Sequence, residues 1–174
     1  SFLDVGHPRD LTVYCSTGVG NFKDKGLNHY AHEGLLKRFI GGHYAVAGPN
    51  MVKLTVENRI EAYNLPQGAL ALLPRNIAGR RPGFISKVGL DTFVDPRVEG
   101  GKLNSVTKED LVEVIQLSGE EWLYYKAPKV DVAIIRGSIA DEHGNMTLHR
   151  EGIIVETTSV AQAAKACGGI VIAQ

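Results

Sequence analysis

The sequence of 174 residues contains only two cysteines, no long apolar run and no net charge. Cys15 and Cys167 lie far apart and form no C-x-x-C pair, so neither a disulfide scaffold nor a zinc site is expected, and a reducing cytoplasm is the expected setting. Basic and acidic side chains number 19 each, which gives no overall attraction to nucleic acid or to an anionic membrane. No apolar run approaches the roughly 18 residues that a membrane span requires.

Several motifs for nucleotides, nucleophiles and metals are also missing. Gly18-Val19-Gly20 follows a predicted strand, but Lys23 stands where the third glycine of G-x-G-x-x-G would be. No G-x-x-x-x-G-K-[ST] or G-x-S-x-G is present, which argues against a P-loop NTPase and an α/β-hydrolase. His29 and His32 are three residues apart, whereas H-E-x-x-H needs them four apart, so we expect them to cap or pack a loop and predict no metal site.

The hydrophobic pattern switches repeatedly between the periods of strands and helices. It predicts strands at 11–16, 43–47, 60–65, 84–88, 130–136, 146–149 and 170–173, and helices at 32–40, 49–58, 66–78 and 153–166. Alternating strands and helices indicate an α/β fold with a mainly parallel sheet flanked by helices on both faces. A small β-hairpin insertion is predicted at 111–117 and 121–126. The apolar, β-branched run 130–136 is typical of a strand buried on both faces.

Length and composition fit one domain with a sizeable core, and no linker or repeat divides the chain. The first residue is Ser1, not methionine, and the last predicted strand reaches Gln174 without a polar tail. We therefore expect residues 1–174 to be a single domain that is a fragment truncated at both ends.

The turn Leu65-Pro66-Gln67-Gly68 joins a predicted strand to a predicted helix. In open α/β sheets, ligands bind outside the carboxyl ends of the strands. Pro66 suits the first turn of a helix, Gly68 allows close approach of a ligand, and the helix N-terminus offers free N–H groups. The neutral amide of Gln67 would suit an oxyanion there. The alternative is that Gln67 only caps its helix.

The long segment 89–106 has neither helical nor alternating periodicity, and a loop of that length inside a compact domain is usually functional. Gly89 and Thr92 could line a ligand, and Phe93 and Val94 could supply an apolar wall. The alternative is a surface loop held by its own side chains. Because the loop follows a strand next to the Gln67 turn, we favour the ligand-lining interpretation.

Four long segments resemble, in order, the acyl-CoA:carboxylate CoA-transferases of family I. They are GLNHYAHEGLLKRFIGGH (26–43), IEAYNLPQGALALLPRNIAGRRPG (60–83), VGLDTFVDPRVEGGKLN (88–104) and VDVAIIRGSIADEHGNMTLHRE (130–151). The likeness covers nearly the whole chain and is nearest to the α-type N-terminal half of the acetate/propionate CoA-transferase branch. It implies the NagB–RpiA-like α/β fold of that family.

The resemblance also implies a chemistry. In this family a glutamate attacks an acyl-CoA thioester to form a mixed anhydride, and the released CoA thiolate then forms a glutamyl-CoA thioester. Gln67 matches the family glutamine beside the reacting carbonyl, which implies a catalytic positioning and oxyanion role. The likeness further implies a substrate-binding turn and acyl pocket formed by Gly68, Gly89, Leu90, Asp91, Thr92, Phe93 and Val94.

The nucleophilic glutamate of this family belongs to the β-type half, which is absent from this sequence. Glu99 precedes two glycines but lies in the α-half loop, and we expect Glu33 at a helix start and Glu61 inside a strand. None of these three is predicted to be the nucleophile. The chain by itself is therefore expected to be inactive, and the β-type half of the same or a second chain is expected to complete the site.

The resemblance implies transfer of coenzyme A between a short-chain acyl-CoA and a carboxylate of the acetate, propionate and lactate class, within short-chain fatty acid metabolism. Coenzyme A is then a substrate, and no metal or redox cofactor is expected. The expected partners are acyl-CoA, a short carboxylate and the β-type half, in a cytoplasmic homo-oligomer without nucleic acid or membrane. An acyl-CoA hydrolase of the same superfamily and a non-catalytic binding or assembly module are the alternatives.

Overall fold

The computed structural model describes residues 2–174, which form two compact units. Of the described residues, unit 1 comprises 2–70 and 85–124, and unit 2 comprises Ala71–Phe84 and Tyr125–Gln174. In chain order the elements are α1 Phe2–Val5, β1 Leu11–Cys15, a 3-10 helix at Leu27–Tyr30, β2 Leu36–Gly41, α2 Tyr44–Ala47, α3 Pro49–Val56, β3 Glu61–Asn64, α4 Gln67–Ala78, β4 Gly83–Ser86, β5 Val112–Leu117, β6 Glu120–Lys126, β7 Val132–Ile135, β8 Ile139–Ala140, β9 Met146–Thr147, α5 Thr157–Ala166 and β10 Ile170–Ala173.

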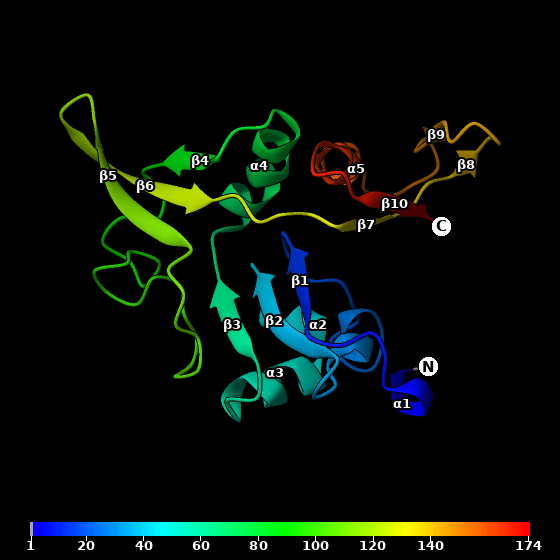
Figure 1. Ribbon diagram of the computed structural model, residues 1–174, viewed down its shortest axis with the longest axis horizontal. Helices are drawn as coiled ribbons and strands as arrows, with labels where there is room; N and C mark the ends of the chain where they lie inside the picture. The colour runs from blue at the N-terminus through cyan, green and yellow to red at the C-terminus, as the bar shows by residue number, and fades with distance from the viewer. Residues whose placement is uncertain (1) are drawn as a thin grey trace. The chain divides into compact units, whose positions relative to one another are not determined.

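Unit 1 is built on a three-stranded parallel sheet in the order β1-β2-β3 (Figure 1). The final residues of the three strands are in register, because Cys15 pairs with Gly41 and Gly41 pairs with Asn64. The three loops that follow therefore leave the sheet at one edge. This alignment makes the edge the expected place for a ligand in an open α/β sheet.

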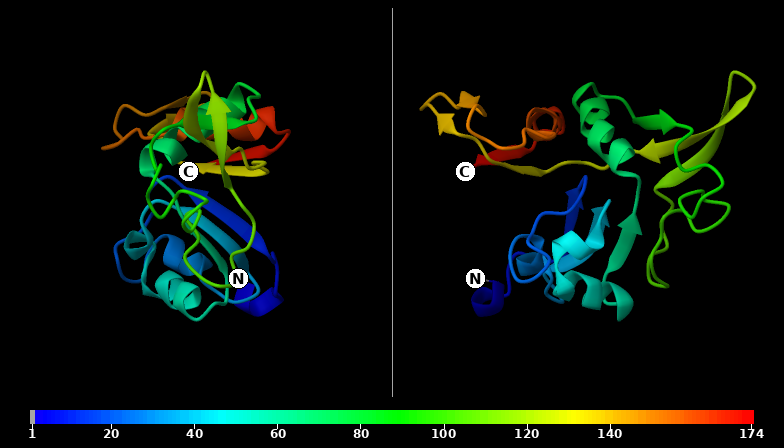
Figure 2. Two further views of the ribbon diagram at one scale, coloured as in Figure 1. Left: turned by 90° about the vertical axis from the view of Figure 1, so that its left-hand side faces the viewer. Right: turned by 180° about the vertical axis from the view of Figure 1, so that it is seen from behind.

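One face of this sheet packs against α2 and α3 (Figures 1 and 2). The residues buried between them are apolar, which removes their side chains from water and stabilises the unit: Ala31, Leu36, Phe39, Ala47, Met51 and Ile60. Tyr44 lies edge-on to Phe39 and donates its hydroxyl to the carbonyls of Phe39 at 2.9 Å and Tyr63 at 3.2 Å. Burial raises the pKa of the Tyr44 phenol well above its ordinary value, so Tyr44 acts here as a neutral donor.

The predicted helix at 32–40 is wrong, because Leu36–Gly41 forms the central strand β2. Leu36, Phe39 and Ile40 are spaced as on one helix face, but in β2 consecutive side chains point to opposite faces that are both covered. Gly34, with a φ of +84°, breaks the backbone just before the strand. The predicted strand at 43–47 is also wrong, since α2 covers Tyr44–Ala47.

Other predicted elements are confirmed with small changes in their bounds. Strands lie at β1, β3, β4 and β10, and helices at α3 and α4. The predicted helix at 153–166 begins only at Thr157, after Val155 adopts a φ of +43°. The predicted hairpin is present as β5 and β6, and β6 lies between β4 and β5.

The edge of β3 is completed by the long loop, which is ordered by backbone hydrogen bonds. The N–H of Asn64 donates to the carbonyl of Gly101 at 2.8 Å, and the N–H of Leu103 donates to Ala62 at 3.0 Å. The Thr107 hydroxyl accepts from the N–H of Ala62 at 2.7 Å, so these polar groups of the strand are satisfied without a fourth strand.

Thr107→Val is expected to destabilise the protein by about 1–3 kcal/mol, because the substitution leaves the buried N–H of Ala62 without its acceptor at nearly constant volume. Urea unfolding measures this loss. Thr12→Val, at an exposed position of β1, is the matched control and is expected to change stability by less than about 0.5 kcal/mol. Equal effects of the two substitutions would contradict the role of this hydrogen bond.

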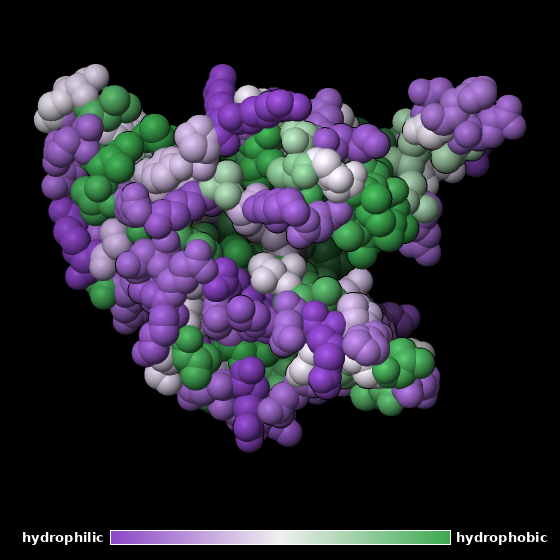
Figure 3. All heavy atoms as spheres, in the orientation of Figure 1, coloured by the Kyte–Doolittle hydropathy of each residue, from purple (hydrophilic) through white to green (hydrophobic). Residues whose placement is uncertain are grey.

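In unit 2, the parallel strands β7 and β10 pair in register, and α5 covers one face of the pair. Ala163 and Ala164 of α5 are fully buried, and their small side chains allow a close approach. The other face carries exposed aliphatic side chains, and Ile134 is 63% exposed. The prediction that this strand is buried on both faces is therefore wrong for β7. Figure 3 shows hydrophobic residues gathered over this part of the molecule. An apolar run alone does not distinguish one covered face from two.

The small antiparallel pair of β8 and β9 follows β7. The turn between them is fixed by Asp141, whose carboxylate accepts the backbone N–H groups of His143 and Asn145 at 2.9 Å each. None of the helices between residues 2 and 174 combines the length and apolar character that crossing a bilayer requires.

Candidate functional site

The three loops at the carboxyl edge of unit 1 meet at Gly42, Ser16 and Gln67. A Cβ atom added at Gly42 would lie 2.5 Å from Cγ of Gln67 and would also collide with the carbonyl oxygen of Ser16. Only glycine fits at this point, because any side chain would displace either the Ser16 backbone or the Gln67 side chain. The fold therefore brings the predicted residue Gln67 against the loop that follows β2.

Gln67 is the first residue of α4, and its side chain is exposed. Its amide forms no hydrogen bond with any of the residues that the structure describes, so no capping contact supports the alternative interpretation. The first N–H groups of a helix lack partners within the helix, and they lie beside this amide. Gly68 is also exposed, and a Cβ atom added there would meet nothing within 4 Å. Both residues can therefore be reached by a ligand.

Asn64, which the sequence reasoning missed, fixes the ends of β2 and β3 relative to each other. With its amide nitrogen turned toward β2, the side chain donates to the carbonyls of Gly41 and Gly42, each 3.2 Å away. The N–H of Leu65 also donates to Gly41, at 3.2 Å. The signal in the sequence was an asparagine directly before the Leu65-Pro66 turn, where an amide can bond neighbouring carbonyls.

The glycine-rich loop after β1 serves packing. A Cβ atom added at Gly18 would lie 2.5 Å from the carbonyl oxygen of His43, and one at Gly20 would collide with Val46. The N–H of Leu27 donates to the carbonyl of Val19 at 2.7 Å, which closes the loop on itself. These glycines are explained by the close approach of the loop to α2, so the incomplete G-x-G motif has a structural reason.

The predicted pocket loop is tied to the end of β3 through Gly101. The N–H of Gly101 donates to the carbonyl of Phe93 at 2.9 Å, and the carbonyl of Gly101 accepts from Asn64. Gly101 has a φ of +72°, and a Cβ atom there would lie 2.5 Å from Cδ2 of Leu65. The loop and the turn that carries Gln67 are therefore joined by the strand end between them.

Within the loop, the predicted pocket residues differ in exposure. Asp91 and Thr92 are exposed, Phe93 is 40% exposed, and Gly89 and Leu90 are half-buried. Val94 is 2% exposed and packs inside the unit. The Thr92 hydroxyl donates to the carbonyl of Gly89 at 2.7 Å and accepts from the N–H of Val94 at 3.2 Å. Among the predicted pocket residues, Phe93 therefore has the most exposed apolar side chain.

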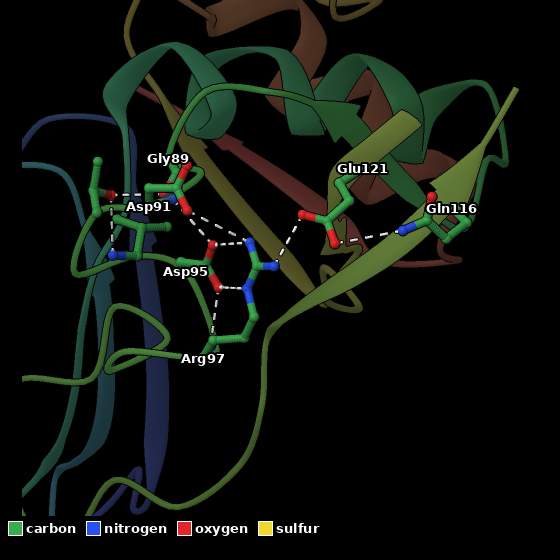
Figure 4. Close-up of polar contacts among 8 residues, drawn as sticks. Gly89, Asp91, Asp95, Arg97, Gln116 and Glu121 are labelled. Carbon is green, nitrogen blue, oxygen red and sulfur yellow. Dashed lines mark hydrogen bonds and ion pairs between the residues drawn. The ribbon is translucent and has the colours of Figure 1, made fainter. Parts of the chain in front are cut away.

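Asp95 anchors the loop from inside (Figure 4). Its side chain is 1% exposed and accepts from Nε of Arg97 at 3.0 Å, from Nη2 of Arg97 at 2.7 Å and from the N–H of Asp91 at 3.0 Å. The Arg97 guanidinium holds the pKa of the Asp95 carboxyl well below its ordinary value, and backbone N–H groups add to this effect against the opposing effect of burial. Asp95 is therefore ionised at neutral pH.

Asp95→Asn is expected to change the acid dependence of stability. A carboxyl with a depressed pKa contributes stability that is complete above its unfolded pKa of about 3.9 and is lost as the pH falls through its folded pKa. The difference in unfolding free energy between wild type and Asp95→Asn should therefore be constant above about pH 5 and shrink below about pH 4. Urea unfolding across this range measures it, and a difference independent of pH would contradict the shift.

The structure also locates the three glutamates that the sequence did not predict to be the nucleophile. Glu61 is half-buried and accepts from Nε of Arg38 at 2.5 Å. Glu33 lies 3.7 Å from Nη1 of Arg59 on the surface, and Glu99 is exposed in the loop. Within residues 2–174, no group of three or more His, Cys, Asp or Glu side chains is arranged to hold a metal ion.

Unit 2 carries two open hollows of about 330 Å³ and 760 Å³ that share Arg80 and Ala166. Their walls come from the C-terminal parts of α4 and α5 and the segment around Pro128. None of the predicted site residues lines either hollow.

The comparisons with known proteins cover nearly the whole chain. The family described as Coenzyme A transferase matches residues 2–173. Caffeate CoA-transferase of Acetobacterium woodii is 48% identical over 174 residues, which are 100% of this chain and 33% of that protein. The probable coenzyme A transferase subunit alpha of Bacillus subtilis (strain 168) is 31% identical over 84% of this chain and 57% of its own length. The chain spans about a third of the length of its more similar relatives.

A solved structure supports the same assignment. The crystal structure of the acyl-CoA transferase YdiF from Escherichia coli O157:H7, a thioester complex with CoA, has a TM-score of 0.96 and 42% identity. The alignment covers 99% of this chain and 34% of that one. The predicted α/β CoA-transferase fold is confirmed. The chain belongs to the coenzyme A transferase family and corresponds to its α-type half.

Proposed function

We propose that this chain is part of an enzyme that moves coenzyme A between a short-chain acyl-CoA and a free carboxylate of the acetate, propionate and lactate class. The observation that carries the proposal is the 42%-identical match, over 99% of the chain, to a CoA-transferase whose structure holds CoA as a thioester. The relatives named for caffeate and acetate support a carboxylate as acceptor.

In the proposed reaction, a glutamate carboxylate of the β-type half attacks the carbonyl carbon of the acyl-CoA thioester. The C–S bond breaks, the CoA thiolate leaves, and a mixed anhydride remains. The thiolate then attacks the glutamyl carbonyl and releases the acyl group as a carboxylate, which gives glutamyl-CoA. The incoming acid reverses these steps. This covalent relay divides one difficult exchange into easier ones.

The α-type half has two proposed roles. The exposed Gln67 amide donates to the oxygen that becomes negative as the thioester is attacked, with the free N–H groups at the start of α4 beside it. The loop from Gly89 to Phe93 supplies the wall of the acyl pocket, and the half-exposed ring of Phe93 is its apolar surface. Gly68 leaves room for the substrate.

The proposed partners are acyl-CoA, a short carboxylate and the β-type half, in a homo-oligomer. Relatives named as α subunits support a division of the enzyme between two halves. The exchange needs no metal or redox cofactor, because the two thioesters are nearly equal in energy. A sequence with only two cysteines, far apart along the chain, supports a cytoplasmic location.

The test uses the full-length protein with acetyl-CoA, with and without propionate or lactate, and measures the acyl-CoA products. The proposal expects propionyl-CoA or lactoyl-CoA with little free CoA. Release of free CoA without an acceptor acid would instead assign a hydrolase of the same superfamily. No reaction with any acid, together with tight association of the two halves, would assign a binding or assembly module.

A further inference from the structure

Arg97 connects the loop from Gly89 to Phe93 with the β5–β6 hairpin (Figure 4). On one side its guanidinium holds buried Asp95 through two nitrogens. On the other side Nη1 donates to Oε2 of Glu121, on β6, at 2.9 Å. Because the guanidinium is planar, the position of one carboxylate constrains the position of the other.

Glu121 is itself held by the neighbouring strand. Gln116 of β5 lies with Nε2 3.5 Å from Oε1 of Glu121, so the two oxygens of Glu121 face different partners. A displacement of the hairpin would therefore move Arg97 and, through its two bonds to the carboxylate, Asp95. Asp95 in turn accepts the N–H of Asp91, in the middle of the proposed pocket wall.

We propose that the β5–β6 hairpin, through Glu121 and Arg97, sets the position of the loop from Gly89 to Phe93 and so determines which carboxylic acids the enzyme accepts. This inference rests on the proposed function of that loop. Glu121 is then a positioning residue that shapes specificity without touching the substrate. Its carboxylate bonds Arg97 and Gln116, and neither of these is one of the proposed pocket residues.

Glu120, the neighbour of Glu121 in the hairpin, provides a matched control. Glu120 precedes Glu121 on β6, and successive side chains of a strand point to opposite faces. Glu120 pairs with Lys87 at 2.9 Å and has a similar exposure, whereas the ion pair with Arg97 is made by Glu121. Glu120→Gln removes the same charge from the same strand without loosening the connection to Asp95.

The experiment compares wild-type full-length protein with Glu121→Gln, Arg97→Lys and Glu120→Gln. It measures kcat/KM for acetate and hexanoate as acceptors, the KM for acetyl-CoA, and amide hydrogen exchange of the loop. Glu121→Gln is expected to change the acetate-to-hexanoate ratio of kcat/KM by about 3- to 30-fold and to speed exchange in the loop. The KM for acetyl-CoA should stay constant. Arg97→Lys should act in the same direction, and Glu120→Gln should match wild type.

An unchanged ratio in both Glu121→Gln and Arg97→Lys would overturn the inference, as would an equal change in Glu120→Gln. A uniform loss of activity with a lower melting temperature would also overturn it, because this is what a purely structural contact would give. If wild type exchanges no acyl group, the proposed function fails. Faster loop exchange in Glu121→Gln alone would then still support the mechanical connection.

Discussion

Gln67→Ala in the full-length protein is expected to lower kcat for CoA transfer by about 10²- to 10³-fold, the usual cost of losing one oxyanion donor. The KM for acetyl-CoA should change far less, because the amide acts on charge that develops only during the attack. Removing an exposed side chain that bonds no described residue should leave the melting temperature unchanged. Steady-state kinetics and a thermal melt measure both quantities.

Gln162→Ala is the control for this prediction. Gln162 is also an exposed glutamine on a helix, α5, and none of the proposed roles involves it. It should leave kcat and stability at their wild-type values. A Gln67→Ala variant as active as Gln162→Ala would contradict the oxyanion role and would favour the binding-module alternative.

Gly42→Ala is expected to reduce both activity and stability. The new methyl group would lie 2.5 Å from Cγ of Gln67 and would collide with the Ser16 carbonyl, which is backbone and cannot turn aside. Overpacking of this kind costs about 1–3 kcal/mol. A displacement of Gln67 by about 1 Å would also lower kcat by about 10²-fold. Urea unfolding and steady-state kinetics measure the two losses.

Gly152→Ala separates this effect from the general effect of adding a methyl group to a loop. A Cβ atom at Gly152 meets nothing within 4 Å, and its φ lies outside the left-handed region. This variant should match wild type in both measurements. If Gly42→Ala folds normally and retains full kcat, the contact between the β2 loop and Gln67 does not matter for the reaction.

The sequence predicted the turn before α4 better than it predicted the strand in the middle of the sheet. Pro66 and Gly68 shape the turn through their own backbone, so the turn can be predicted from the residues next to one another in the sequence. The run from Leu36 to Ile40 fits both a helix and a doubly covered strand, and local spacing does not separate these possibilities. The neighbours β1 and β3 on either side of it decide in favour of the strand.

The anchoring of the loop from Gly89 to Phe93 could not be predicted from the sequence, for a different reason. The pair Asp95 and Arg97 is visible in the sequence, but its extension to Glu121 depends on how residues 24 positions apart meet. The same holds for Gly42 and Gly101, whose need for glycine comes from atoms of Gln67 and Leu65 placed against them by the fold.

The sequence by itself determined the α/β class, the Pro66-Gln67 turn at a strand end and the likeness to CoA-transferases. Each of these features depends on residues that lie close together along the chain. Only the tertiary structure decided that the three strand ends lie in register, that Gln67 lies against Gly42, and that Arg97 bonds both Asp95 and the hairpin residue Glu121. Each of these depends on the packing of distant segments, because their positions are fixed by contacts that no local pattern encodes.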